Sequence, residues 1–137
     1  MIFKSEEKVY YADTDAYGVV WHGTYLRWLE AARSKFCDEV GCPLDVLAKE
    51  HNIIFPVVNI NISYKRSAKL YADIVVETEV KELSKLAVVF HQRIKDQHDD
   101  TLYVDATVKA VAINDKTGEL YRHFPDVVYD KFKSLVQ

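Results

Sequence analysis

The sequence is poor in glycine and proline, the residues that mark flexible linkers and many unusual backbone conformations. Only 4 of the 137 residues are glycine and 3 are proline, whereas glycine ordinarily makes up about 7% of a chain. This scarcity excludes collagen-like repeats, long flexible linkers and glycine-rich loops that cradle phosphates. The positions of the few glycines therefore mark places where the backbone needs special freedom.

Cysteine is scarce as well, and its spacing matches no metal or redox motif. Cys37 and Cys42 lie five positions apart, which fits neither a zinc site nor a CxxC pair. The five histidines include no HExxH pattern. We therefore expect two free thiols in a reducing compartment, no metal site and no cofactor.

The chain also lacks an excess of positive charge and any long apolar run. Its net charge is −3 and its pI is about 5.9, which argues against a nucleic-acid partner. No apolar run approaches the roughly 20 residues of a membrane span, and residues 1–11 have no apolar centre typical of a signal peptide. We expect a cytoplasmic protein without a membrane span.

What the sequence does have is an ordinary globular composition. Hydrophobic residues make up 49% and charged residues 28% of the chain. A length of 137 residues predicts one domain covering residues 1–137. A chain of this length buries enough surface to build a core without disulfides or metals.

The first part of the chain predicts a strand followed by a long helix. Residues 3–12 alternate loosely between apolar and polar, as a strand does. Residues 24–40 place apolar side chains three and four positions apart, which predicts a helix with one buried face. Gly41 and Pro43 form a stop signal, and Pro43 opens a short helix over 44–51.

The rest of the chain alternates with a period of two, which predicts four half-buried strands. They cover residues 58–65, 74–81, 86–95 and 102–112. Short connectors predict antiparallel pairing between neighbours. Glycine in the turn 115–118 provides the positive φ that turns need, and Pro125 begins a weak terminal helix. The order predicts an α+β fold in which a five-stranded antiparallel sheet wraps around one long central helix, with edges that favour dimerisation.

One segment, residues 9–33, combines a carboxylate with a helix start. Asp15 lies in a turn that Gly18 makes tight, and the helix begins close to His22. A helix N-terminus offers unpaired N–H groups that could stabilise an oxyanion. A nearby carboxylate could attack a carbonyl or activate water. However, turns and helix caps favour the same residue types for structural reasons alone, so the spacing by itself identifies no reaction.

Residues 10–33, YYADTDAYGVVWHGTYLRWLEAAR, resemble the motif of hotdog-fold acyl-CoA thioesterases of the 4-hydroxybenzoyl-CoA thioesterase family. The positions that match are Thr14-Asp15, Gly18-Val19-Val20, Trp21-His22 and Tyr25. A second stretch, residues 64–73, resembles an aromatic and basic turn of the family that leads to an acidic residue. The turn lacks the proline that many relatives carry there, and Trp21 stands where Tyr or Phe is common, which affects the expected substrate fit more than the chemistry.

The resemblance implies hydrolysis of acyl-CoA to a carboxylic acid and free CoA. It assigns Asp15 as nucleophile or general base and the backbone N–H of His22 as the oxyanion donor. Gly18 and Val19 would shape the loop, and Trp21 and Tyr25 would bind the acyl group. Tyr64 is a further candidate for substrate binding, and the basic residues Lys65, Arg66, Lys69 and Lys85 would meet the phosphates of CoA. The family also implies a homo-oligomer, a dimer or homotetramer, with the site between subunits.

Two other functions remain compatible with the sequence. One is a module that binds acyl-CoA or acyl-carrier protein without catalysis, which the presence of Asp15 argues against. The other is a dehydratase of the same fold, although such sites pair Asp with His at a different spacing. Glu30 is a less favoured alternative carboxylate, because an exposed helix residue of this kind would pair with Arg27 or Arg33. Cys37 lacks a neighbouring base and is an improbable nucleophile.

Overall fold

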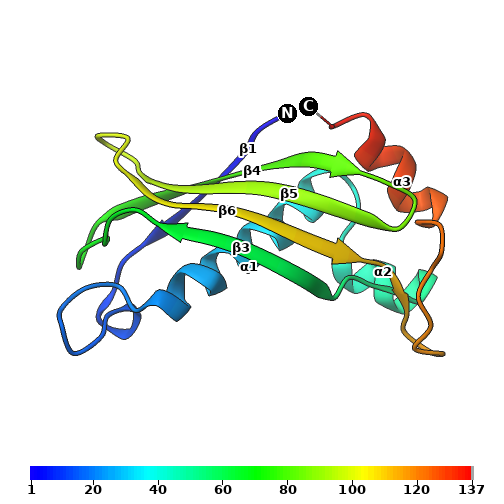
Figure 1. The fold of residues 1–137 in the computed structure, drawn as a ribbon, viewed down its shortest axis with the longest axis horizontal. Coiled ribbons are helices and arrows are strands. Elements are labelled where there is room, and N and C mark those ends of the chain that lie inside the picture. Colours follow the sequence, from blue (N-terminus) through cyan, green and yellow to red (C-terminus); the bar gives the residue numbers. More distant parts are fainter. Residues whose placement is uncertain (137) are drawn as a thin grey trace.

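A five-stranded antiparallel sheet and one long helix lying along it form the body of the protein (Figure 1). The structure is a computed structural model and describes residues 1–136. The strand order is β1-β4-β5-β6-β3. These strands are β1 (Phe3–Lys8), β3 (Val57–Tyr64), β4 (Asp73–Leu83), β5 (Ala87–Asp96) and β6 (Leu102–Val111). The predicted α+β class and the five-stranded antiparallel sheet are confirmed.

Helix α1 (His22–Glu39) lies against one face of the sheet because its apolar residues form a single stripe. Tyr25, Trp28, Leu29 and Phe36 on this stripe are all buried. The helix begins at His22, slightly earlier than the predicted residue 24, and Gly41 follows its end with φ +83. The helix therefore ends where the sequence predicted, because Gly41 adopts the left-handed backbone conformation that favours glycine.

The core beneath α1 divides into two apolar clusters, one toward each end of the helix. The cluster at the helix N-terminus includes Tyr25, Trp28 and Ile74, and the other is rich in aromatic rings. Gln92 is fully buried on β5, and its Nε2 donates to the Leu29 carbonyl at 3.0 Å and to Thr78 Oγ1 at 3.0 Å. These bonds satisfy a polar group that would otherwise be costly to bury.

The prediction that neighbouring strands pair was wrong for β3 and β4. Strand β3 pairs with β6 at one edge of the sheet, and β4 lies between β1 and β5. The connection 65–72 therefore crosses the end of the sheet instead of forming a hairpin. Ala68, in this connection, is fully buried and its carbonyl accepts the N–H of Val20 at 3.2 Å. The crossover places the basic turn that follows Tyr64 beside the start of α1.

Smaller elements complete the fold, and some of them were not predicted. Helices α2 (Leu44–His51) and α3 (Asp126–Lys133) match the predicted positions. The first strand ends at Lys8, and a 3₁₀ turn follows at Tyr11–Asp13, where the prediction extended the strand to residue 12. The two-residue strands β2 (Ile53–Ile54) and β7 (Ile113–Asn114) form a separate pair. No helix within residues 1–136 has the length and apolar character needed to cross a membrane.

Strand β3 is an edge strand with unusually high exposure. Seven of its eight residues are exposed and only Ile62 is half-buried. Within residues 1–136 it pairs with β6 alone, so its other edge has unpaired N–H and C=O groups. Val58 and Ile60 expose 54% and 38% of their surface. An open apolar edge of this kind is a surface that proteins usually cover.

Candidate active site

The loop 14–20 joins the 3₁₀ turn to α1 and holds Asp15 at its start. Asp15 N–H donates to the Val19 carbonyl at 2.9 Å, and Gly18 N–H donates to the Asp15 carbonyl at 3.1 Å. Thr14 and Val20 form an antiparallel bridge across the base of the loop. Gly18 has φ +77, a conformation that an L side chain would strain. The glycine predicted to make this turn tight therefore has that role.

The carboxylate of Asp15 is half-buried and only partly engaged within the chain. Its Oδ1 accepts the backbone N–H of Tyr17 at 2.8 Å, which fixes the side chain within its own turn. Among residues 1–136, Oδ2 has no hydrogen-bond donor. The group is thus oriented by the loop and still has an oxygen available for other atoms.

The start of α1 presents backbone N–H groups close to this loop. Trp21 occupies the N-cap position and provides no side-chain cap. The N–H of His22 has no acceptor among residues 1–136, as expected for the first turn of a helix. The positive end of the helix dipole adds to the attraction for a negative oxygen at this point.

Gly23 allows the Trp21 ring to fold over the first helical turn. A Cβ built at Gly23 would lie 2.3 Å from Cζ3 of that ring, closer than non-bonded atoms approach. The Trp21 and His22 rings lie with their centroids 5.1 Å apart. Trp21 nevertheless exposes 51% of its surface, so its ring is open to solvent at the start of α1.

The crossover after β3 supplies the other wall of the site. The Tyr64 hydroxyl donates to the His22 carbonyl at 3.3 Å, and Ala68 N–H donates to the Tyr25 hydroxyl at 2.9 Å. The Tyr25 and Tyr64 ring centroids are 5.7 Å apart. Burial raises the pKa of Tyr25, so its hydroxyl is neutral and retains its proton.

An open cavity of about 230 Å³ lies between the helix start and the crossover. Its lining residues are Val20, His22, Tyr25, Tyr64, Lys65, Arg66 and Ser67. A second depression next to it, of about 670 Å³, shares Arg66 and Ser67 and adds Lys69. The predicted residues of the helix start and the basic turn are therefore adjacent in space. Exposed cations beside a cavity can bind phosphate groups.

Lys85 is the predicted residue that lies away from this group within one chain. It is in the hairpin between β4 and β5, where its carbonyl accepts the N–H of Phe124 at 2.7 Å. That hairpin is at the end of the sheet opposite the loop 14–20 (Figure 1). Gly18 and Val19 lie in the loop itself, as predicted, and Val19 bridges to Lys69.

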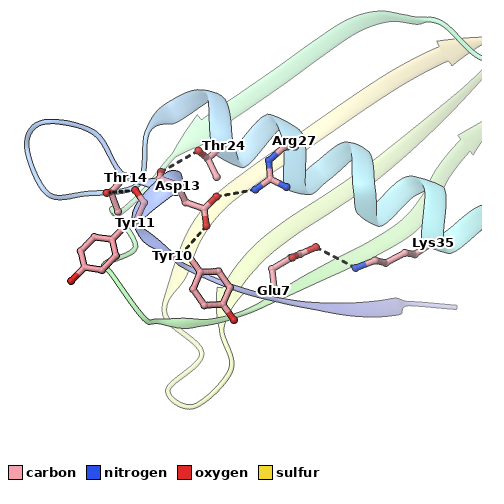
Figure 2. Close-up of polar contacts among 8 residues, drawn as sticks. All are labelled: Glu7, Tyr10, Tyr11, Asp13, Thr14, Thr24, Arg27 and Lys35. Atoms are coloured by element: carbon pink, nitrogen blue, oxygen red, sulfur yellow. Dashed lines mark hydrogen bonds and ion pairs between the residues drawn. The ribbon is translucent and has the colours of Figure 1, made fainter.

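Asp13 is the residue of this region that sequence reasoning did not single out. Its side chain is buried and forms an ion pair with Arg27 at 2.9 Å (Figure 2). Because Arg27 is engaged there, the predicted pairing of Glu30 with Arg27 is wrong. Glu30 does interact electrostatically with Arg33, where its charge raises the pKa of Arg33 against the larger lowering by burial. The available signal was a second carboxylate two positions before Asp15, but its partner could not be identified from spacing.

Other reactive groups in the described chain are less suited to chemistry. No group of three or more His, Cys, Asp or Glu side chains within residues 1–136 could hold a metal ion. Cys37 and Cys42 are free and buried, as expected. Burial raises the pKa of the Cys37 thiol to about 12. This thiol therefore remains protonated at neutral pH and is a poor nucleophile.

Comparison with known proteins gives consistent matches along nearly the whole chain. Residues 9–132 match the family model of the Thioesterase-like superfamily. The chain is 35% identical over 112 residues to the acyl-CoA thioesterase YbgC of Haemophilus influenzae, covering 82% of this chain and 81% of that protein. It is 30% identical over 132 residues to the acyl-CoA thioester hydrolase YbgC of Escherichia coli, covering 96% of each.

A solved structure extends the similarity to three dimensions. The DHNA-CoA thioesterase of Staphylococcus aureus superposes with a TM-score of 0.88 at 28% sequence identity. The match covers 97% of this chain and 89% of that one. Family and fold therefore agree, since the same region carries both the sequence match and the structural match.

Proposed function

The chain belongs to the Thioesterase-like superfamily and is an acyl-CoA thioesterase, and we propose that Asp15 and the start of α1 carry out its reaction. The substrate is a thioester RCO–S–CoA, and water converts it to a carboxylic acid and free CoA. The observation that supports this assignment is the loop geometry. It fixes the Asp15 carboxylate within the loop that leads directly into α1, and the first N–H of this helix has no acceptor among residues 1–136.

Asp15 supplies the carboxylate that begins the reaction by one of two routes. As a nucleophile, it attacks the thioester carbon, expels CoA thiolate and forms a mixed anhydride that water then hydrolyses. As a general base, it removes a proton from the attacking water, and CoA thiolate leaves directly. A single turnover in ¹⁸O-labelled water tests for the first route: when water attacks the Asp15 carbon of the anhydride, the label enters Asp15 and the product acid carries none, whereas the general-base route always labels the product.

The backbone N–H of His22 stabilises the oxyanion that forms on the thioester carbonyl in either route. It lies in the first turn of α1, where the helix dipole favours negative charge. Donors of this type act best when they are fixed before the reaction begins. The Tyr64 hydroxyl, which donates to the His22 carbonyl, contributes to that fixation. The reaction requires no metal or cofactor, so we expect activity to persist in EDTA.

The acyl group and CoA occupy the two adjacent depressions. The rings of Tyr25 and Tyr64 line the inner cavity with Val20, and this surface suits an apolar acyl group. Gly18 and Val19 shape the loop beside it, and Trp21 forms its rim. Arg66 and Lys69 line the outer depression, Lys65 lines the neighbouring inner cavity, and these three cations bind the CoA phosphates.

The exposed edge of β3 implies a dimer that brings Lys85 to the site. If two β3 strands pair antiparallel about a twofold axis, the end of one β3 at Val57 meets the end of the other at Tyr64. The β4–β5 hairpin lies at the Val57 end of the sheet. The partner's Lys85 then lies at the same end as Arg66 and Tyr64 of the first subunit. The assembly is a dimer or a homotetramer of two such dimers, which sedimentation distinguishes.

The Asp15→Asn variant tests the catalytic assignment. It keeps the size of the side chain and an acceptor for the Tyr17 N–H, but it removes the charge. We expect kcat to fall by about 100-fold or more, with an unchanged Tm. The assay measures thiol release with DTNB from short aliphatic and aromatic acyl-CoAs, which also identifies the preferred acyl group. Asp115→Asn, in an exposed turn far from the site, is the control.

Two outcomes would contradict the proposal. Near-normal hydrolysis by Asp15→Asn would show that another group starts the reaction. An absence of thiol release from every thioester by the unaltered protein, together with measurable acyl-CoA binding, would instead indicate a non-catalytic binding module.

A further inference from the structure

We propose that Asp13, through its ion pair with Arg27, is a positioning residue that fixes the loop carrying Asp15 against the start of α1. This inference rests on the proposed role of Asp15. Among the carboxylates of residues 1–136, only that of Asp13 is buried, with 7% of the residue exposed. A buried carboxylate is costly unless partners satisfy it, so its contacts show what it holds in place.

Both carboxylate oxygens of Asp13 are engaged, and they join separate parts of the chain (Figure 2). Oδ1 accepts Nη2 of Arg27 on the second turn of α1 at 2.9 Å. Oδ2 accepts the backbone N–H of Tyr10, just beyond β1, at 2.9 Å. The side chain therefore connects the end of the first strand to the long helix.

The backbone carbonyl of Asp13 makes two more bonds, both to the start of α1. It accepts the N–H of Trp21 at 2.9 Å and the hydroxyl of Thr24 at 3.1 Å. The loop 14–20 thus leaves from Asp13 and returns to it through the bond to Trp21. Because Asp15 lies in this closed loop and His22 directly follows Trp21, the relative position of the two reacting groups depends on Asp13.

Loss of the Arg27 partner should disturb this arrangement more than loss of an exposed ion pair would. A buried carboxylate without its cation must find water, because an unpaired charge is unfavourable in the interior. Without the guanidinium, Oδ1 of Asp13 loses its donor, and a shift of Asp13 toward solvent carries Asp15 with it. A misplacement of about 1 Å can reduce turnover by roughly 100-fold.

A second ion pair on the same helix provides a matched control. Lys35 Nζ lies 3.2 Å from Glu7 Oε1 and also joins α1 to β1, but away from the loop (Figure 2). The two pairs differ mainly at the carboxylate, since the Asp13 side chain is 10% exposed and the Glu7 side chain 25%, while both cations are largely exposed, Arg27 at 62% and Lys35 at 46%. Removal of Lys35 therefore alters an equivalent strand–helix connection without touching the site.

The experiment compares Asp13→Asn, Arg27→Gln and Lys35→Gln in the full chain. We expect the first two to lower kcat by about 10-fold to 100-fold with KM within twofold, because the residues that bind CoA are unaffected. Their double variant should lose less than the product of the single losses, since both act through one contact. Amide hydrogen exchange of residues 14–21 should be faster in both variants and unchanged in Lys35→Gln.

Several outcomes would overturn the proposal. Normal kcat in Asp13→Asn and Arg27→Gln, with Asp15→Asn inactive, would reject the positioning role and leave the catalytic assignment intact. Unchanged exchange in the loop would reject it as well, whatever the kcat. Normal activity of Asp15→Asn would instead contradict the proposed role of Asp15, on which this inference rests. If Asp13→Asn does not fold, Arg27→Gln and Arg27→Lys decide the matter, because Arg27 is exposed and Lys should recover part of the lost turnover.

Discussion

Each end of the molecule has its own apolar cluster, but the contacts that supplement it differ between the two ends. At the loop end, backbone and side-chain hydrogen bonds join Asp13, the start of α1 and the crossover at Ala68. At the opposite end, the rings of Phe36, Phe90 and Phe132 pack edge to face with centroids 5.7–6.1 Å apart. The comparison suggests a division of roles: aromatic packing provides stability, and a polar network provides position.

The largest effect on stability is expected from Phe36→Ala at the aromatic end. Phe36 is fully buried and contacts both other rings, so truncation leaves a cavity. Substitutions of this kind lower the free energy of unfolding by about 3–5 kcal/mol. For a chain of this length that corresponds to a fall in Tm of roughly 10–17 °C. Calorimetry measures the loss, and kcat per folded molecule below the transition should stay normal.

Activity must be measured together with stability in Phe36→Ala, because only then does the variant show whether the two ends act independently. A fall in kcat similar to that of the loop variants would mean that the two ends are coupled along α1. Phe36→Leu, which leaves a smaller cavity, is the graded control and should lose less stability.

An intermediate effect, on turnover instead of stability, is expected from Gly23→Ala at the loop end. Alanine favours helices over glycine by up to about 1 kcal/mol, so Tm should not fall. The new Cβ would, however, overlap the Trp21 ring and move the residue whose N–H binds Asp13. We expect kcat to fall by about 10-fold, measured by thiol release at saturating substrate.

The double variant Gly23→Ala with Trp21→Ala tests the cause of that loss. Removal of the ring removes the overlap, so turnover should recover relative to Gly23→Ala with Trp21 present. If the single Gly23→Ala variant keeps full activity, the close approach of Trp21 has no part in positioning the site.

Sequence periodicity predicted most of the elements, because burial of one face imposes a period of two or 3.6 on any chain. It correctly located α1, α2, α3 and the four long strands. It could not show that β3 lies at the far edge, because pairing partners depend on the path of the connection 65–72 through space. That crossover is what brings Tyr64 and Arg66 to His22. Periodicity could not predict this proximity, and only the family resemblance of residues 64–73 made these residues candidates.

The site was predictable only as far as its motif extends. Asp15, Gly18 and His22 are close in sequence, so one local pattern identified them. The ion pair of Asp13 with Arg27 joins residues 14 positions apart, and it depends on how the 3₁₀ turn meets the helix. Lys85 is a different case. The family resemblance predicts it at the site, but within one chain it lies at the opposite end of the sheet, so only a second subunit can bring it there.

The smallest effect is expected from an exposed pair at the loop end, His98 and Asp73. His98 Nε2 lies 2.8 Å from Asp73 Oδ2. The hydrogen bond from His98, and then that from Lys8, lowers the pKa of Asp73, while the bond to Asp73 raises the pKa of His98. The His98 contribution to stability is present below its ordinary pKa of 6.5 and is lost as the pH rises through the raised pKa.

The stabilising contribution of Asp73 depends on pH in the opposite direction, so the pair stabilises the protein only within a limited pH range. Its contribution is present above the ordinary pKa of 3.8 and is lost as the pH falls through the lowered value. Both contributions to stability are therefore fully present between pH 3.8 and 6.5. In Asp73→Asn, NMR titration should show the His98 pKa moving back toward 6.5, with kcat unchanged. A His98 pKa that stays raised would assign the shift to Asp96 and Asp99 instead. A fall in kcat would extend the positioning network from Asp13 to the whole loop end.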